Sequence, residues 1–384
     1  MDKGILSIVC VVLSLQTLAQ ETETKNLIII TLDGLRWQEV FEGADAEILF
    51  QERFVTDKNV IKTFWSPLPS ERRMKLMPFL WQTIGTQGQI YGNRKYNNRV
   101  DCTNPHWFSY PGYSEMLLGF VDWRVRSNKP INNPNRTVLD FIQSQPGFKN
   151  RVATFATWDM IENMACEKIP AFEMNAGKQL AVGNISEREV LLNQLQEFIQ
   201  NPHGPRYDAF TFFYAFEYLK RSCPRVMFIS FDETDEHAHG GRYDEYLKSA
   251  HKTDEMIRIL WEWVQSQVDY KDQTTILIST DHGRGNGANH SWKKHGRFSI
   301  GSNQIWFAVI GPDTPAKGEI KTDSQYYQKQ IAKTAAAFLG LNYSHVKPVG
   351  HVIEPMISPS VQGKGNASIV HELIFLNRTS HQRE

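Results

Sequence analysis

The chain has 384 residues, of which 42 are basic and 42 acidic, so its formal net charge is zero. Balanced charge gives no field of one sign that would draw in nucleic acid or an anionic membrane, and any charge recognition is expected to be local. The chain has no linker, charge block or internal repeat that would divide it, which favours one large domain with insertions.

The first twenty residues predict a secretory signal peptide. Lys3 precedes an apolar run over residues 5–15, and a small-residue cleavage pattern ends at Ala19-Gln20. The run is shorter than the roughly 20 apolar residues of a spanning helix, so a transmembrane anchor is the less favoured alternative. We therefore expect a signal peptide at residues 1–20 and a secreted or periplasmic mature chain over residues 21–384. Its three cysteines, Cys102, Cys166 and Cys223, allow at most one disulfide.

Five short apolar runs bounded by polar or turn residues predict buried strands of a largely parallel sheet. They cover residues 27–32, 152–156, 226–231, 275–279 and 305–310. Helical patterns lie between them, the clearest over residues 243–264. A second amphipathic stretch runs over residues 326–338 and stops before Gly340, which suits a helix cap. Alternating strands and helices predict an α/β architecture.

The segment over residues 43–99 is different, because its prolines, arginines and tryptophans show little periodicity. We interpret it as an insertion near the mouth of the functional site. A packed surface excursion is the alternative.

Carboxylates and imidazoles follow three of the predicted strands. They are Asp33 after the first run, Asp235 and His239 after the third, and Asp281 and His282 after the fourth, with His295 a short loop further on. Taken singly, each is more often a cap or turn former. Ligands of open α/β sheets collect at the carboxyl ends of the strands, and three aspartates with three histidines suffice for two borderline metal ions such as zinc. His290 is the alternative for the last ligand.

Ser109 lies where a helix is predicted to begin, with Pro111 in its first turn and Gly119 at its end. The free amides and the positive dipole end of such a helix favour an ionised serine or a bound phosphate. The alternative is that Ser109 serves only as the N-cap.

In these residues the chain resembles the alkaline phosphatase superfamily, which includes phosphatases, nucleotide phosphodiesterases, cofactor-independent phosphoglycerate mutases and sulfatases. The matching motifs, in the family's order, are Leu32-Asp33-Gly34, the segment from Ser109 to Gly119, Asp235-x3-His239, Thr280-Asp281-His282-Gly283 and His295-Gly296. The resemblance implies an alkaline-phosphatase-like three-layer α/β sandwich with a largely parallel central sheet and helices on both faces. It covers one catalytic domain over residues 21–384.

The resemblance also implies a role for each matched residue. Asp33, Asp281 and His282 would bind the metal ion that contacts Ser109, and Asp235, His239 and His295 would bind a second ion. Zn²⁺ is the expected metal, with Mn²⁺ or another divalent ion as the alternative. Ser109 would attack a phosphate ester and form a covalent phosphoserine. Candidate contacts to the phosphate are Asn128, Arg36 and Arg284, which could equally be surface or capping residues.

The sequence thus predicts an exported hydrolase whose partner is a small phosphate ester, either a monoester or a diester. Sulfatases form formylglycine where the sequence reads Cys/Ser-x-Pro-x-Arg. Here Ser109 and Pro111 are present, but Tyr113 replaces the arginine, which favours phosphate. A sulfatase-like enzyme and a non-catalytic metal-binding protein on this fold remain alternatives, and the oligomeric state stays open.

Overall fold

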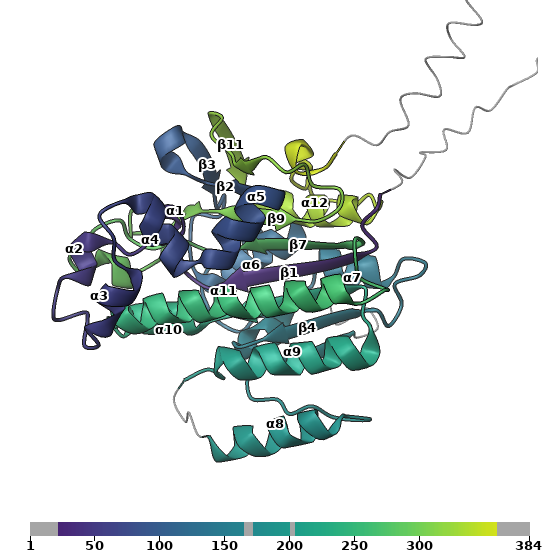
Figure 1. Ribbon diagram of the computed structural model, residues 1–384. Helices are drawn as coiled ribbons and strands as arrows, with labels where there is room; N and C mark the ends of the chain where they lie inside the picture. The colour runs from purple at the N-terminus through teal and green to yellow at the C-terminus, as the bar shows by residue number, and fades with distance from the viewer. Residues whose placement is uncertain (1–21, 165–171, 200–203, 359–384) are drawn as a thin grey trace, which may run out of the picture.

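A computed structural model describes residues 22–164, 172–199 and 204–358 (Figure 1). The predicted signal peptide and Cys166 lie outside these ranges. Within them, Cys102 is buried, Cys223 is exposed, and both are free thiols. No helix in these ranges is long and apolar enough to cross a bilayer.

Strands and helices alternate along the chain, as predicted. The strands are β1 Asn26–Leu32, β2 Gln89–Tyr91, β3 Asn98–Asp101, β4 Val152–Ala156, β5 Glu173–Ala176, β6 Val226–Phe231, β7 Thr274–Ser279, β8 Gln304–Ile305, β9 Phe307–Ile310, β10 Gly318–Glu319 and β11 Ser324–Tyr327. The α-helices are α1 Trp37–Glu42, α2 Ala46–Leu49, α3 Asn59–Phe64, α4 Pro69–Leu76, α5 Gly85–Gln87, α6 Ser109–Leu118, α7 Val138–Gln143, α8 Glu187–Phe198, α9 Asp208–Ser222, α10 Glu233–His239, α11 Tyr243–Ser266 and α12 Ile331–Phe338.

Among the described residues, eight strands form one central sheet in the order β10-β2-β9-β7-β1-β6-β4-β5. The neighbours from β7 to β5 are all parallel to one another, whereas β9 runs antiparallel to β7. A small second sheet contains β11, β3 and β8. The carboxyl ends of the parallel strands therefore meet at one edge of the central sheet, where ligands of such folds bind.

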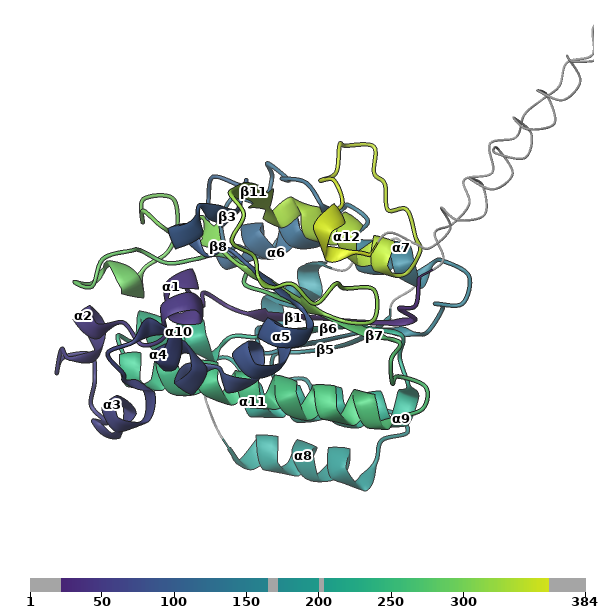
Figure 2. The same cartoon turned by 45° about the horizontal axis from the view of Figure 1, so that its top comes forward.

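Alternate side chains of the central strands enter two different cores. In β1, Ile28, Ile30 and Leu32 face the core under α9 and α11, while Leu27 and Ile29 face the core shared with α6, α7 and α12. Because both faces of such a strand are buried, its sequence reads as a continuous apolar run. Figures 1 and 2 show these helices on opposite sides of the sheet. The predicted three-layer α/β sandwich is confirmed.

Four of the five predicted strands coincide with β1, β4, β6 and β7 to within one residue. The prediction of one strand over residues 305–310 was wrong, because the run contains two strands. Strand β8 pairs with β3 in the small sheet, and β9 joins the central sheet antiparallel to β7. The buried indole of Trp306 donates to the carbonyl of Leu35 at 3.0 Å and fixes the point where the chain passes between the sheets.

One of the two predicted helices agrees with the structure, and the other begins later than predicted. The pattern over residues 243–264 lies within α11. The helix predicted over residues 326–338 begins later, since Tyr326 and Tyr327 end β11 beside β3 and α12 starts at Ile331.

Residues 43–99 are built into the domain core. Ile48, Phe64 and Leu76 of α2, α3 and α4 are buried in it, and β2 pairs with β9 in the central sheet. Helices of four to eight residues are too short to display a clear 3.6-residue period, which explains the irregular sequence.

Helix α6 starts at Ser109, and its N-cap residue is Phe108. Ser109 is therefore not the N-cap. Pro111 lies in the first turn and Gly119, with φ of 75°, ends the helix, as predicted. Gly112 lets α6 lie directly against the backbone beyond β7, because a Cβ there would come 2.3 Å from the carbonyl oxygen of Asp281.

We expect Gly112→Ala to lower the free energy of unfolding by about 1–3 kcal/mol, the usual cost of overpacking a close contact. Gly85→Ala is the control, since its Cβ would meet no atom closer than 3.4 Å. Urea unfolding of both variants measures the difference. Equal stability of the two would show that the approach of α6 to Asp281 is not a tight constraint.

Candidate two-metal active site

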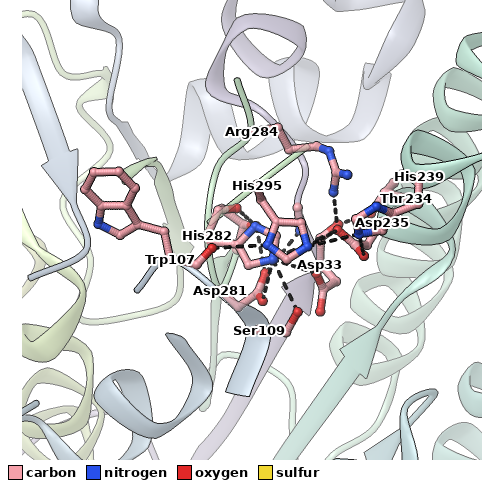
Figure 3. A network of polar contacts seen from close by, with 12 residues as sticks. Asp33, Trp107, Ser109, Thr234, Asp235, His239, Asp281, His282, Arg284 and His295 are labelled. Atoms are coloured by element: carbon pink, nitrogen blue, oxygen red, sulfur yellow. Dashed lines mark hydrogen bonds and ion pairs between the residues drawn. The ribbon is translucent and has the colours of Figure 1, made fainter. Parts of the chain in front are cut away.

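Three neighbouring strands deliver acidic and imidazole side chains to one point (Figure 3). Asp33 follows β1, and Asp281 and His282 follow β7. Helix α10, which follows β6, carries Asp235 in its first turn and His239 at its end. The strand-end pattern of the sequence thus becomes a cluster in space.

A first group surrounds the imidazole of His282. Its Nε2 atom lies 3.4 Å from Asp33 Oδ1 and 3.4 Å from Asp281 Oδ2. The hydroxyl oxygen of Ser109 lies 3.2 Å from the same nitrogen. All four side chains are buried. Ser109 therefore faces the same point as the three candidate ligands.

Each carboxylate and the imidazole of this group make hydrogen bonds through the atom that faces away from the cluster. Tyr113 donates its hydroxyl hydrogen to Asp33 Oδ2 at 3.0 Å, and the Gly34 amide donates to Asp281 Oδ1 at 3.1 Å. The inward oxygens, Asp33 Oδ1 and Asp281 Oδ2, are buried without a hydrogen-bond partner among the described residues. Nδ1 of His282 lies 2.8 Å from the carbonyl of Gly283, so its Nε2 can present a lone pair. Two orphaned oxygens beside an imidazole nitrogen fit a divalent cation.

A second group contains Asp235, His239 and His295. His239 Nε2 lies 3.0 Å from Asp235 Oδ2 and 2.9 Å from His295 Nε2, and the latter lies 3.8 Å from Asp235 Oδ1. Nδ1 of His295 contacts the carbonyl of Trp107 at 3.1 Å. His282 stacks on His295 with ring centroids 3.9 Å apart, which places the two groups side by side.

The surrounding protein disfavours the ionised form of two of the three buried carboxylates. Burial and the neighbouring charge of Asp281 raise the pKa of Asp33. Burial, together with the charge of Asp235, raises the pKa of Asp281 to about 7. Burial acts in the same direction on Asp235, but the Arg284 guanidinium and the nearby imidazoles outweigh it and hold the pKa of that carboxyl well below its usual range.

Two of the histidines, His282 and His295, are held neutral by a lowered pKa. Burial lowers the pKa of His282 to about 4 and the pKa of His295 to about 3. Neutral imidazoles are the form that binds metal ions. Asp33 and Asp281 ionise more easily when a cation lies beside them, and the neutral imidazoles can bind that cation. Together these shifts favour a bound cation.

His295, not His290, joins this cluster. Nε2 of His290 lies 3.3 Å from Arg53 Nη1, and its ring packs against Phe54.

The two predicted arginine contacts to substrate are corrected by the structure. Arg36 is fully buried, and its guanidinium donates to Glu39, Asp45 and the carbonyl of Gly285. Neither it nor Arg284 lines the cavity described below.

Arg284 donates to Asp235 Oδ1 (Figure 3). It also donates to the carbonyls of Trp292 and Lys293. Buried guanidinium groups need several hydrogen-bond acceptors. Both arginines therefore cross-link the segments that surround the site.

A cavity of about 480 Å³ opens from Ser109 past Asp235, His239, His295 and Asn128. Oδ1 of Asn128 accepts a hydrogen bond from the Tyr110 amide at 3.0 Å.

The outer walls of this cavity come from residues that the sequence analysis did not single out. They are residues 157–159 after β4, residues 177–178 after β5 and residues 204–206 before α9. Residues 157–159 follow a correctly predicted strand, so the strand-end rule could have found them. Residues 43–99 contribute nothing to the lining, and the predicted insertion at the mouth is therefore not supported.

No protein-family model and no curated protein matches this sequence. Solved structures do match the fold. A putative sulfatase from Bacteroides thetaiotaomicron has a TM-score of 0.58 and 12% identity, covering 89% of this chain and 76% of that chain. The phosphonate monoester hydrolase of Agrobacterium radiobacter has a TM-score of 0.54 and 13% identity, covering 90% and 82%. The chain therefore shares the alkaline-phosphatase-like fold of these structures.

A third structure with this fold is an inactive murine ectonucleotide pyrophosphatase/phosphodiesterase 5 in complex with AMP. Its TM-score is 0.53 at 9% identity, covering 87% of this chain and 100% of that chain. The names of these three proteins refer to different substrates. At such low sequence identities, the similarity shows the fold alone.

The raised carboxyl pKa values predict that chelator-treated protein loses stability as pH rises from about 6.5 to about 8. Asp33 and Asp281 keep protons in the folded state that the unfolded chain releases near pH 4, so ionisation in this window opposes folding. The depressed histidine pKa values act in the opposite direction, but only below about pH 6.5. Thermal melts with and without added Zn²⁺ measure the loss and its reversal.

Asp281→Asn is the control for this measurement, since its amide cannot ionise. We expect a flatter pH dependence for this chelator-treated variant than for the wild-type protein. Identical slopes would show that Asp281 does not carry the effect.

Proposed function

We propose that the chain is a metal-dependent hydrolase that cleaves phosphate esters with Ser109 as the nucleophile. The observation that carries the proposal is the position of the Ser109 hydroxyl, 3.2 Å from His282 Nε2 at the start of α6. It faces buried carboxylate oxygens that have no partner among the described residues. Three aspartates and three histidines are a donor set suited to two zinc ions.

In this proposal Asp33, Asp281 and His282 hold one ion. Asp235, His239 and His295 hold the other. Bound divalent ions supply Lewis acidity, which lowers the pKa of a hydroxyl and neutralises charge on phosphoryl oxygens.

Ser109 Oγ attacks phosphorus and loses its proton, the bond from phosphorus to the leaving-group oxygen breaks, and a phosphoserine forms. Water then cleaves the phosphoserine and regenerates the hydroxyl. The amide end of α6 favours the anion. The Asn128 carbonyl already accepts from Tyr110, which leaves its NH₂ group to donate to a phosphoryl oxygen.

The position of Tyr113 supports phosphate over sulfate. Tyr113 stands where the formylglycine motif has arginine, and its buried hydroxyl donates to Asp33 Oδ2 while accepting from Ser230 at 3.0 Å. This residue thus positions a ligand and cannot supply the arginine of that motif. We also propose export, on the strength of the signal peptide predicted at residues 1–20.

We expect Ser109→Ala to reduce hydrolysis of nitrophenyl phosphate by roughly 10³-fold or more, because the attacking oxygen is removed. Metal content should stay unchanged. Ser114→Ala, another buried serine of α6, is the matched control and should retain activity. Turnover by Ser109→Ala at the wild-type rate would exclude Ser109 as the nucleophile.

Peptide mass spectrometry should find Ser109 unmodified in the purified protein. Phosphate-ester cleavage should then exceed cleavage of nitrophenyl sulfate by orders of magnitude, and parallel assays with nitrophenyl phosphate and bis-nitrophenyl phosphate distinguish monoesters from diesters. An aldehyde at Ser109, or a preference for sulfate, would place the chain with the sulfatases.

A further inference from the structure

Helix α10, which carries Asp235 and His239, begins without a side-chain cap from its own N-cap residue, Asp232. The first amides of a helix have no acceptor within the helix. Here the acceptor comes from a different helix, because Asp208 at the start of α9 accepts from the amides of Asp232 and Glu233. The distances are 2.9 Å to Asp208 Oδ1 and 3.1 Å to Asp208 Oδ2.

Asp208 is itself rigidly held. Its side chain is buried, and Oδ1 also accepts the Thr157 hydroxyl at 2.6 Å. The Asp208 amide donates back to Glu233 Oε1 at 3.2 Å. The starts of α9 and α10 and the residue that follows β4 are thus joined at one carboxylate. Thr157 lines the substrate cavity, so this junction also reaches the cavity wall.

We infer that Asp208 is a positioning residue for the metal ion assigned to Asp235, His239 and His295. The inference rests on the proposed function. Asp235 lies two residues after Glu233, so the placement of the first turn of α10 sets the direction of its carboxylate.

The other ion depends much less on this junction. Asp33 and Asp281 follow β1 and β7, and their outer carboxylate oxygens are held by Tyr113 and Gly34. Among the described residues, one hydrogen bond runs from α10 to this group, from the Thr234 hydroxyl to the backbone carbonyl of Asp33 at 2.5 Å. Losing Asp208 should therefore weaken one ion selectively.

Asp254 provides a control of the same chemistry away from the site. This buried carboxylate on α11 accepts from the amides of Phe79 and Leu80 at 2.7 and 2.9 Å. It does not line the cavity. Asp254→Asn and Asp208→Asn each place an NH₂ group where an oxygen met a backbone N–H, so both are expected to lower the melting temperature.

The experiment titrates Zn²⁺ into chelator-treated wild-type protein, Asp208→Asn and Asp254→Asn, in competition with a chromophoric chelator. In Asp208→Asn we expect one of two ions to bind about 10- to 100-fold more weakly, the usual effect of losing an outer-shell partner, and the other to stay within about twofold. Asp254→Asn should bind both ions as the wild type does. His239→Ala identifies the affected ion, because the step weakened in Asp208→Asn should be the one that His239→Ala removes.

Each other outcome overturns the inference. Asp208 has a purely structural role if Asp208→Asn binds both ions as the wild type does. The same conclusion follows if Asp208→Asn and Asp254→Asn weaken the binding of both ions to the same extent. A wild-type protein that binds fewer than two ions overturns the proposed function as well. If Asp208→Asn does not fold, Thr157→Val keeps the carboxylate of Asp208 and removes its hydrogen bond from Thr157, together with the bond between Thr157 and Thr211. It should weaken the same ion by a smaller factor. No change in that variant would also contradict the inference.

Discussion

The concentration of buried carboxylates at the carboxyl ends of β7, β1 and β6 is the constraint on which the site depends. Asp33, Asp281 and Asp235 converge there because parallel strands end at the same edge. Buried charge must be paired or bind a cation. The protein binds the outer oxygens of Asp33 and Asp281 through Tyr113 and Gly34 and leaves the inner ones facing His282. The hydrogen bonds to the outer oxygens thus fix the two carboxylates in an orientation that suits a cation.

Ser109 and the second group of candidate ligands are linked through the loop before α6. Glu115 of α6 accepts from the backbone amides of Thr103 and Asn104, and the Asn104 side chain accepts from the Trp107 amide at 3.0 Å. Trp107 has φ of 50°, a conformation that a non-glycine residue adopts only when its surroundings hold it there. Its carbonyl then orients His295. Helix α6 therefore positions both the Ser109 hydroxyl and an imidazole of the neighbouring group.

Sequence reasoning located the centre of the site because its signal is local. Asp33, Asp281 and Asp235 each follow a strand that could be predicted from an apolar run, and Gly119 marks the end of the helix that Ser109 begins. The roles of Arg36 and Arg284 could not be predicted, because a charged residue near a motif gives no indication of which acceptors the fold will bring to it. Asp208 was missed for the same reason. Its partners, Asp232 and Glu233, are more than twenty residues away in the sequence and meet it only once α9 and α10 are packed.

The direction of the cavity follows from the sheet order. On one side of the central strands lies β9, which is antiparallel, so its amino end at Phe307 stands beside the carboxyl end of β7. Strand β2, beyond β9, also ends at this edge, but the residues that follow it do not line the described cavity. On the other side β6, β4 and β5 are parallel, and each ends at the same edge as the ligands. Residues that follow β4 and β5, including Thr157 and Lys178, line the cavity beyond the ligand cluster. The residues after β4 and β5 thus form the outer part of the cavity, and those after β7, β1 and β6 form the cluster of carboxylates and imidazoles.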